Sequence, residues 1–199
     1  VPILGRVLGA LLHDGAVTGV RLVANTRDRG AEPFILDAVR HLGLDVHHLR
    51  WTDDTAGQAA TAALGARWLV DEGLGEEPVL FHNVDTLVEG RDLRGIARDL
   101  AIRDGFIDVF DADSPAYSYV QVDDAGVVTA IAEKQTISRL ATSGLYGFRS
   151  AAAFLGAYAR TRAAGEHYVS AVYAQMLQEG AAIVARSEEH TSELQSPCN

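Results

Sequence analysis

In the middle of the chain, a short apolar run at residues 78–81 (PVLF) is followed at once by the polar residues Asn83 and Asp85. Such a run, preceded by the acidic turn 75–77, is typical of a strand that is buried in a parallel sheet. In an open α/β sheet, ligands bind beyond the carboxyl ends of the strands, so an acid that leaves a strand there faces the expected crevice. Asp85 could therefore hold a divalent cation against nucleotide phosphates, or it could cap a turn between strand and helix.

The N-terminal part of the chain alternates between helical and extended patterns. Apolar spacing predicts helices at 5–14 and 32–41 and strands at 20–25 and 45–51. A longer helix to about residue 70 follows the polar turn 52–58, where Thr55 or Asp54 can act as the cap. Short connections in this order favour a parallel sheet that helices cover.

The C-terminal half of the chain is richer in strand patterns. It predicts helices at 92–101, 151–159 and 168–177, and strands at 105–110, 117–122, 127–132, 141–148 and 182–185. The sequence DDAG at 123–126 is typical of a hairpin turn. We therefore expect one α/β domain with a Rossmann-like, three-layer α/β/α fold, a mainly parallel central sheet and an added β-hairpin region.

The balance of charge limits the partners of the chain. Its 199 residues carry a formal net charge of -10, and an acidic surface repels a phosphate-rich polymer such as a nucleic acid. No apolar stretch approaches the roughly 18 to 20 residues that cross a bilayer, and no signal peptide opens the chain. We therefore expect a cytoplasmic protein that binds neither nucleic acid nor membrane. Whether the chain forms a homo-oligomer is left open by the sequence.

The two ends of the chain need separate interpretation. The chain starts with Val1 rather than Met, so it can begin inside a longer protein. The segment 186–196 (RSEEHTSELQS) resembles the translation of a common sequencing adapter. We expect 186–199 to be a non-native tail, with a natural polar tail as the alternative. The only cysteine, Cys198, lies in this tail, so the expected domain, 1–185, uses neither disulfides nor thiol chemistry.

An adjacent acid and base, Glu133 and Lys134, end one of the expected strands. Most such pairs are solvated at the surface. In an apolar hairpin region, however, a lysine suits a phosphate as a point charge, and a glutamate suits sugar hydroxyls as an acceptor. The histidines do not fall in the spacing of a zinc site, so surface or capping roles are expected for them.

Several segments, taken in order, resemble one known family, the sugar-1-phosphate nucleotidyltransferases, also called nucleotide-sugar pyrophosphorylases. VPILGR at 1–6 is similar to the segment after that family's Lys-Pro motif, TAGQAAT at 55–61 to its base-recognition turn, and NVD at 83–85 to its metal-binding motif. The strongest part of the resemblance is the series DGFIDVF, YSYVQVDDAGVV, EKQTIS, ATSGLYGF and GEHYVSAVY. It covers most of residues 1–185 and looks most like a branch associated with cell-envelope and surface-polysaccharide synthesis.

The resemblance implies a nucleotidyltransferase fold and transfer of a nucleoside monophosphate. The phosphate oxygen of a phosphorylated acceptor, such as a sugar 1-phosphate, attacks the α-phosphorus of a nucleoside triphosphate, and pyrophosphate leaves. For the nucleotide, the resemblance implies that Gly57 and Gln58 meet the base, that Asn83 adds a further contact, and that Asp85 holds Mg²⁺. No residue need act as a covalent nucleophile.

For the acceptor, the resemblance implies a second group of residues. Lys134 would neutralise the acceptor phosphate, and Glu133 would orient its hydroxyls. The backbone of Gly144 would pass close to the acceptor, and Glu166 would line its pocket. These roles are carried over from the family's motifs and make alignment and charge neutralisation the protein's contribution to the reaction.

The chain departs from the family pattern in three places. The Gly-rich loop and the cations that hold the triphosphate should lie before Val1, and the family's usual Pro is replaced by Val7. A second metal-binding Asp usually follows the Gly-Glu pair, yet Ser170 and Ala171 stand there. We therefore expect the parent protein to be an enzyme and this chain by itself to turn over little or not at all.

Two other functions stay open from the sequence. A non-catalytic regulatory domain on the same scaffold would bind nucleotide or sugar phosphate without releasing pyrophosphate. A glycosyltransferase uses a similar nucleotide-binding sheet, but it would accept a nucleotide-sugar, and a Glu-Lys pair suited to a phosphate acceptor speaks against it.

Overall fold

A computed structural model describes residues 3–45, 48–161 and 167–187 of the chain. Its helices are α1 (Ile3–Leu12), the 3₁₀ helix η1 (Thr26–Ala31), α2 (Glu32–His41), α3 (Gln58–Asp71), α4 (Leu93–Ile102), α5 (Ala151–Arg160) and α6 (Val169–Gln178). Its strands are β1 (Leu22–Asn25), β2 (Leu49–Thr52), β3 (Val79–His82), β4 (Gly105–Asp111), β5 (Tyr119–Val122), β6 (Val128–Ala132), β7 (Leu140–Phe148) and β8 (Ile183–Arg186). Every helix and strand that the sequence predicted is present, within a few residues at its ends, and η1 is additional.

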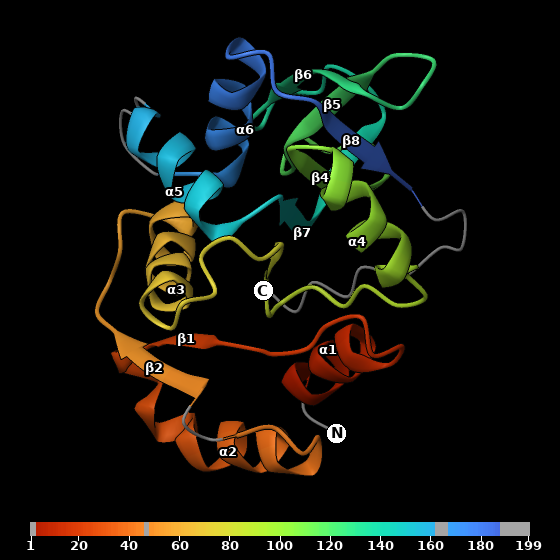
Figure 1. The fold of residues 1–199 in the computed structure, drawn as a ribbon. Helices are drawn as coiled ribbons and strands as arrows, with labels where there is room; N and C mark the ends of the chain where they lie inside the picture. Colours follow the sequence, from red (N-terminus) through yellow and green to blue (C-terminus); the bar gives the residue numbers. More distant parts are fainter. Residues whose placement is uncertain (1–2, 46–47, 162–166, 188–199) are drawn as a thin grey trace.

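The strands form two sheets in the described part of the chain. β1 and β2 pair in parallel as a two-stranded sheet, as the N-terminal alternation of elements predicted. The larger sheet has six strands in the order β6-β5-β7-β4-β8, with β3 paired to β7 beside this path. In Figure 1 the β1–β2 pair lies apart from the larger sheet, next to α2.

The α/β class is confirmed, but the prediction of a mainly parallel central sheet is wrong for the larger sheet. β7 pairs antiparallel with β3, β4 and β5, and β5 pairs antiparallel with β6; β4 and β8 are parallel. β6 and β7 run in one direction and β3, β4, β5 and β8 in the other, and β7 lies between β4 on one side and β3 and β5 on the other, so most pairings are antiparallel. A strand that is buried on both faces has the same apolar composition in either direction, so the sequence pattern carried no sign of this reversal.

Helices cover both faces of the larger sheet, which gives the expected three layers (Figure 1). On one face, α3, α5 and α6 pack around a cluster of aromatic side chains that includes Phe148, Phe154 and Tyr173. On the other face, α4 packs Leu100 against Phe106 of β4 and neighbouring apolar residues. Burial of these large apolar side chains is the main force that holds the layers together.

The loops that follow β1 and β2 are tied to each other. The side chain of Asn25 donates to Asp54 at 2.8 Å, and the hydroxyl of Thr26 donates to Asp53 at 2.7 Å. Arg27 also forms an ion pair with Asp54. These contacts fix the loop that leads into α3, at the edge of the sheet where ligands of α/β proteins bind.

The expected side-chain cap of α3 is not formed. Asp54 is held by Asn25 and Arg27, and the hydroxyl of Thr55 contacts the Gly57 carbonyl and Thr61 instead. The capping position is taken by Gly57, whose φ of 131° favours glycine and whose backbone carries no capping side chain. The first turn of α3 therefore has no side-chain acceptor of its own.

Within the described ranges, the structure contains no helix whose length and apolar character would allow it to cross a lipid bilayer.

Candidate functional site

The residues predicted to bind the nucleotide lie together at the start of α3 and the end of β3. The Gln58 side chain donates a hydrogen bond from Nε2 to Oδ1 of Asn83. The backbone N–H of Asn83 in turn donates to the carbonyl of Gly144, at 3.1 Å. These two bonds place Gln58, Asn83 and Gly144 in one connected group, although they come from three different elements.

Gly144 occupies a bulge in β7. The pairing of β7 with β4 jumps between Ile107 and Val109, and Gly144 lies in the part of β7 that this jump leaves out of register. Its φ is 95°, and an added Cβ would lie 2.8 Å from the Asn83 Nδ2 atom. Only a glycine allows the backbone of β7 to approach Asn83 this closely.

The predicted acceptor pair, Glu133 and Lys134, is held by two groups from the start of α6. Oε2 of Glu133 accepts hydrogen bonds from the hydroxyls of Ser170, at 2.6 Å, and Ser118. Nζ of Lys134 donates to the hydroxyl of Tyr168 at 2.8 Å and lies 4.8 Å from the centre of its ring. Both residues of the pair are therefore oriented by hydroxyl groups rather than solvated at random.

Lys134 is unusual in two ways. It is the only lysine in a chain whose other strong cations are arginines. It also has a φ of 52°, and no other described non-glycine residue has a positive φ. A strained backbone at a polar position is a feature that clusters at ligand sites, and a lysine offers a compact charge to a phosphate.

His167 joins the two halves of the group. Its backbone N–H donates to Ala56, and its carbonyl accepts from the N–H of Ala59, both at 2.7 Å. Its ring contacts the hydroxyl of Tyr158 at 2.8 Å. Because Tyr168 follows directly, these bonds bring the start of α3, with Gln58, next to the start of α6, with the contacts to Lys134 and Glu133.

Asp85 lies in the exposed turn after β3, three residues beyond the end of the strand. Its Oδ1 accepts a hydrogen bond from the hydroxyl of Thr86, at 3.2 Å. No three His, Cys, Asp or Glu side chains in the described ranges form a metal-binding group. A single carboxylate nevertheless suits Mg²⁺, which keeps several waters and is often bound by one or two carboxylates together with substrate phosphates.

His82, the last residue of β3, is partly buried, and both of its ring nitrogens are shielded from solvent. Neither of its ring nitrogens makes a hydrogen bond of good geometry to the described residues. Desolvation by burial lowers the pKa of His82 from 6.5 to about 4, and the Gly144 backbone and the charge of Asp85 only partly oppose this shift. The imidazole is therefore neutral when the folded protein is at neutral pH.

This burial predicts a specific dependence of stability on pH. Above pH 6.5, His82 is neutral in both the folded and the unfolded chain. Between pH 6.5 and about 4, the unfolded chain takes up a proton that the folded chain does not, so the free energy of unfolding falls, by about 3 kcal/mol in total. Urea denaturation at a series of pH values should show this loss in the wild type and not in His82→Leu; parallel curves for the two proteins would contradict it.

The sequence did not identify Ser118, Ser170 or His167 as parts of the site. Serines and histidines in loops and first helical turns are common, and nothing in their spacing shows that they reach Glu133 or the start of α3. Ser170 was noted only because an acid was expected near it, and its side chain contacts Glu133 instead. Glu166, which was expected to line the acceptor pocket, lies outside the described residues.

The two serines predict a graded effect on acceptor binding. Ser170→Ala removes one of two hydroxyl donors to Glu133, so the affinity for a sugar 1-phosphate should fall roughly tenfold, in keeping with a hydrogen bond to a charged group. Ser138→Ala is the matched control, because the Ser138 hydroxyl donates to the Val120 carbonyl and not to Glu133. Isothermal titration calorimetry compares the two variants, and equal affinities would remove Ser170 from the site.

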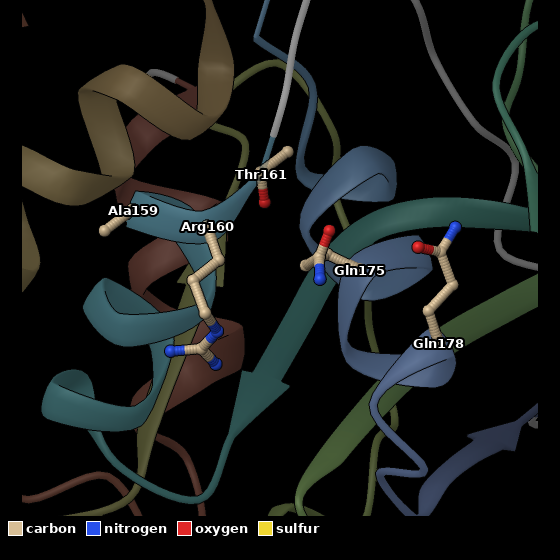
Figure 2. Close-up of a pocket in the computed structure, with 5 residues that line it drawn as sticks. All are labelled: Ala159, Arg160, Thr161, Gln175 and Gln178. Carbon is tan, nitrogen blue, oxygen red and sulfur yellow. The ribbon is translucent and has the colours of Figure 1, made fainter.

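A separate hollow lies between the end of α5 and the last turns of α6. Figure 2 shows its lining, which consists of the residues Ala159, Arg160, Thr161, Gln175 and Gln178. It measures about 620 Å³, but Arg160, the charged group that lines it, is paired with Glu179, at 2.7 Å. It lies at the opposite end of α6 from Ser170, so it is not part of the group described above.

Comparison with known proteins gives matches in structure only. No protein-family model matches the sequence, and no curated protein does. A nucleoside-diphosphate-sugar pyrophosphorylase from Vibrio cholerae superposes with a TM-score of 0.74 and 24% identity, over 94% of this chain and 79% of that chain. A protein named as a glucose-1-phosphate thymidylyltransferase from Bacillus anthracis superposes with a TM-score of 0.72 and 15% identity, over 92% and 74% of the two chains. The chain therefore has the sugar-nucleotidyltransferase fold that its motifs resemble.

Proposed function

We propose that this chain is the core of a nucleotidyltransferase that transfers a nucleoside monophosphate from a nucleoside triphosphate to a phosphorylated acceptor, with release of pyrophosphate. The observation that carries the proposal is the connected group at the starts of α3 and α6. It joins Gln58 and Asn83 to Gly144 and, through the backbone of His167, to the contacts of Lys134 and Glu133. A nucleotide and an acceptor bound to the two halves would be neighbours.

In the proposed reaction, a phosphate oxygen of the acceptor attacks the α-phosphorus of the triphosphate. A new P–O bond forms, and the bond between the α-phosphorus and the pyrophosphate oxygen breaks. Lys134 neutralises the charge of the acceptor phosphate, and Glu133, with Oε2 occupied by two serine hydroxyls, directs Oε1 toward acceptor hydroxyls. The protein thus contributes alignment and charge neutralisation.

Asp85 would hold the metal ion of this reaction, for which we propose Mg²⁺. When bound, the ion neutralises the charge of the triphosphate. The remaining contacts come from the chain: Gln58 offers to a base its Oε1 and the N–H of Nε2 that it does not donate to Asn83, and the first turn of α3 lacks a side-chain cap. We further propose that the protein acts in the cytoplasm, and the resemblance supports a role in making nucleotide-sugars for the cell envelope.

A second candidate is a regulatory domain that binds the same ligands without turnover. It is favoured by the contacts of Ser170, which stands near the expected second acid and uses its hydroxyl to hold Glu133. Ala171 next to it offers no ligand either. This arrangement leaves the acceptor half of the group without a second carboxylate for a metal ion.

The test is Mg²⁺-dependent binding of the nucleoside triphosphates ATP, CTP, GTP and UTP, measured by calorimetry. Asp85→Asn is expected to lower the Mg²⁺-dependent affinity roughly tenfold or more, because it removes the charged ligand. Asp124→Asn, in the exposed turn between β5 and β6, is the matched control and should bind like the wild type. Binding that is the same in Asp85→Asn as in the control would overturn the role of Asp85.

A further inference from the structure

A buried ion pair joins the loop that carries Asp85 to strand β4. Arg91 and Asp108 are only 7% and 1% exposed, and they make two parallel contacts: Nε to Oδ1 at 2.6 Å and Nη2 to Oδ2 at 3.2 Å. Arg91 comes at the end of the loop between β3 and α4, and Asp108 is in the middle of β4. The pair therefore fixes the far end of the loop to the central sheet.

Stability alone does not explain this pair. When two charges are removed from water, they lose hydration free energy that their mutual attraction often does not offset. Apolar residues of similar size can therefore replace such pairs without loss of stability. Here the loss is larger, because the Nη1 atom of Arg91 is buried without a hydrogen-bond partner among the described residues. What a two-point contact of this kind adds is geometry, since it fixes both the distance and the orientation of the arginine.

The same loop is fixed at its near end by the site itself. Its first residue, Asn83, donates its backbone N–H to Gly144, in the β7 bulge that lies opposite Asp108. Between the two anchors, Leu87 and Val88 are buried, whereas Asp85 stays exposed. The loop thus presents one carboxylate from a short segment that is held at both ends.

We propose that Arg91 is a positioning residue, which acts through Asp108 to fix the loop 83–91 so that the Asp85 carboxylate faces the cation of the bound triphosphate. The expected effect of Arg91 on Mg²⁺-dependent nucleotide binding rests on the proposed function. Its expected effect on the order of the loop can be measured without any ligand. It assigns no contact with substrate to Arg91, which is buried on the side of the loop away from solvent.

The test compares two identical chemical changes. Arg91→Lys keeps the charge and removes the two-point contact, whereas Arg160→Lys makes the same change in the exposed, two-point pair with Glu179. Hydrogen exchange measured by mass spectrometry should become roughly tenfold faster in the loop of Arg91→Lys, and the Mg²⁺-dependent affinity for the best of the four triphosphates should fall roughly tenfold. Arg160→Lys should change neither quantity.

A double variant guards against the case in which Arg91→Lys fails to fold because it leaves Asp108 buried with a poor partner. Arg91→Met/Asp108→Leu removes both charges, so global unfolding should stay close to the wild type while the loop exchanges faster. Wild-type exchange in this loop, or loss of cooperative unfolding in the double variant, would overturn the positioning role. Failure of the proposed function is a different result, in which Asp85→Asn leaves Mg²⁺-dependent binding unchanged while the loop still responds to Arg91.

Discussion

Replacing Gly144 by alanine is expected to lower the free energy of unfolding by about 2 to 4 kcal/mol and to weaken nucleotide binding in whatever protein still folds. Two effects add. The φ of 95° is strained for any residue with a Cβ, and the new methyl group would lie 2.8 Å from Nδ2 of Asn83, inside the buried strand β7. The clash pushes away the side chain that Gln58 contacts.

Gly180→Ala separates the two effects. Gly180 also has a positive φ, 81°, but nothing lies within 4 Å of an added Cβ. It should therefore lose only the backbone term, about 1 kcal/mol, and keep full nucleotide affinity. Urea denaturation and calorimetry measure both quantities, and equal losses in the two variants would show that the approach of Asn83 to Gly144 is not needed.

Replacing Lys134 by glycine is expected to separate binding from stability. The affinity for a sugar 1-phosphate should fall about 100-fold, because the change removes the charge that we propose neutralises the acceptor phosphate. The free energy of unfolding should stay within about 1 kcal/mol of the wild type, because glycine adopts the φ of 52° without strain and this offsets the lost contact with Tyr168.

Lys134→Arg is the control that keeps the positive charge of the side chain and changes its shape. It keeps the cation but not the compact ammonium that reaches the Tyr168 hydroxyl, so an intermediate affinity is expected. Acceptor affinity is measured by calorimetry and stability by urea denaturation for both variants. A Lys134→Gly protein that binds the acceptor like the wild type would remove Lys134 from the site, whatever its stability.

The sequence was sufficient to predict the helices and strands, but not the directions in which the strands run in the larger sheet. Helical and extended patterns depend on the spacing of apolar residues, which local physics imposes, and these predictions were confirmed from α1 to β8. The antiparallel course of β7 depends on its place in the fold, between β4 on one side and β3 and β5 on the other, and both directions bury the same apolar run. The sheet prediction failed for this reason.

From the sequence, residues of the candidate site could be predicted only where they belong to a recognisable motif. Gln58, Asn83 and Gly144 were named from the resemblance, and the structure places them in one hydrogen-bonded group. Arg91 was not named, and Ser170 was named only as a departure from the family pattern, because their importance comes from partners far away in the sequence, Asp108 and Glu133. Such contacts follow from the fold and leave no local pattern.

The most direct test of the account is pyrophosphate release. The chain would be joined, before Val1, to the Gly-rich segment of a characterised sugar nucleotidyltransferase, and the four triphosphates would be screened with several sugar 1-phosphates and Mg²⁺. The account predicts release only when both substrates are present, and loss of release in Asp85→Ala. Mg²⁺-dependent nucleotide binding without release, or release that Asp85→Ala leaves intact, would contradict it.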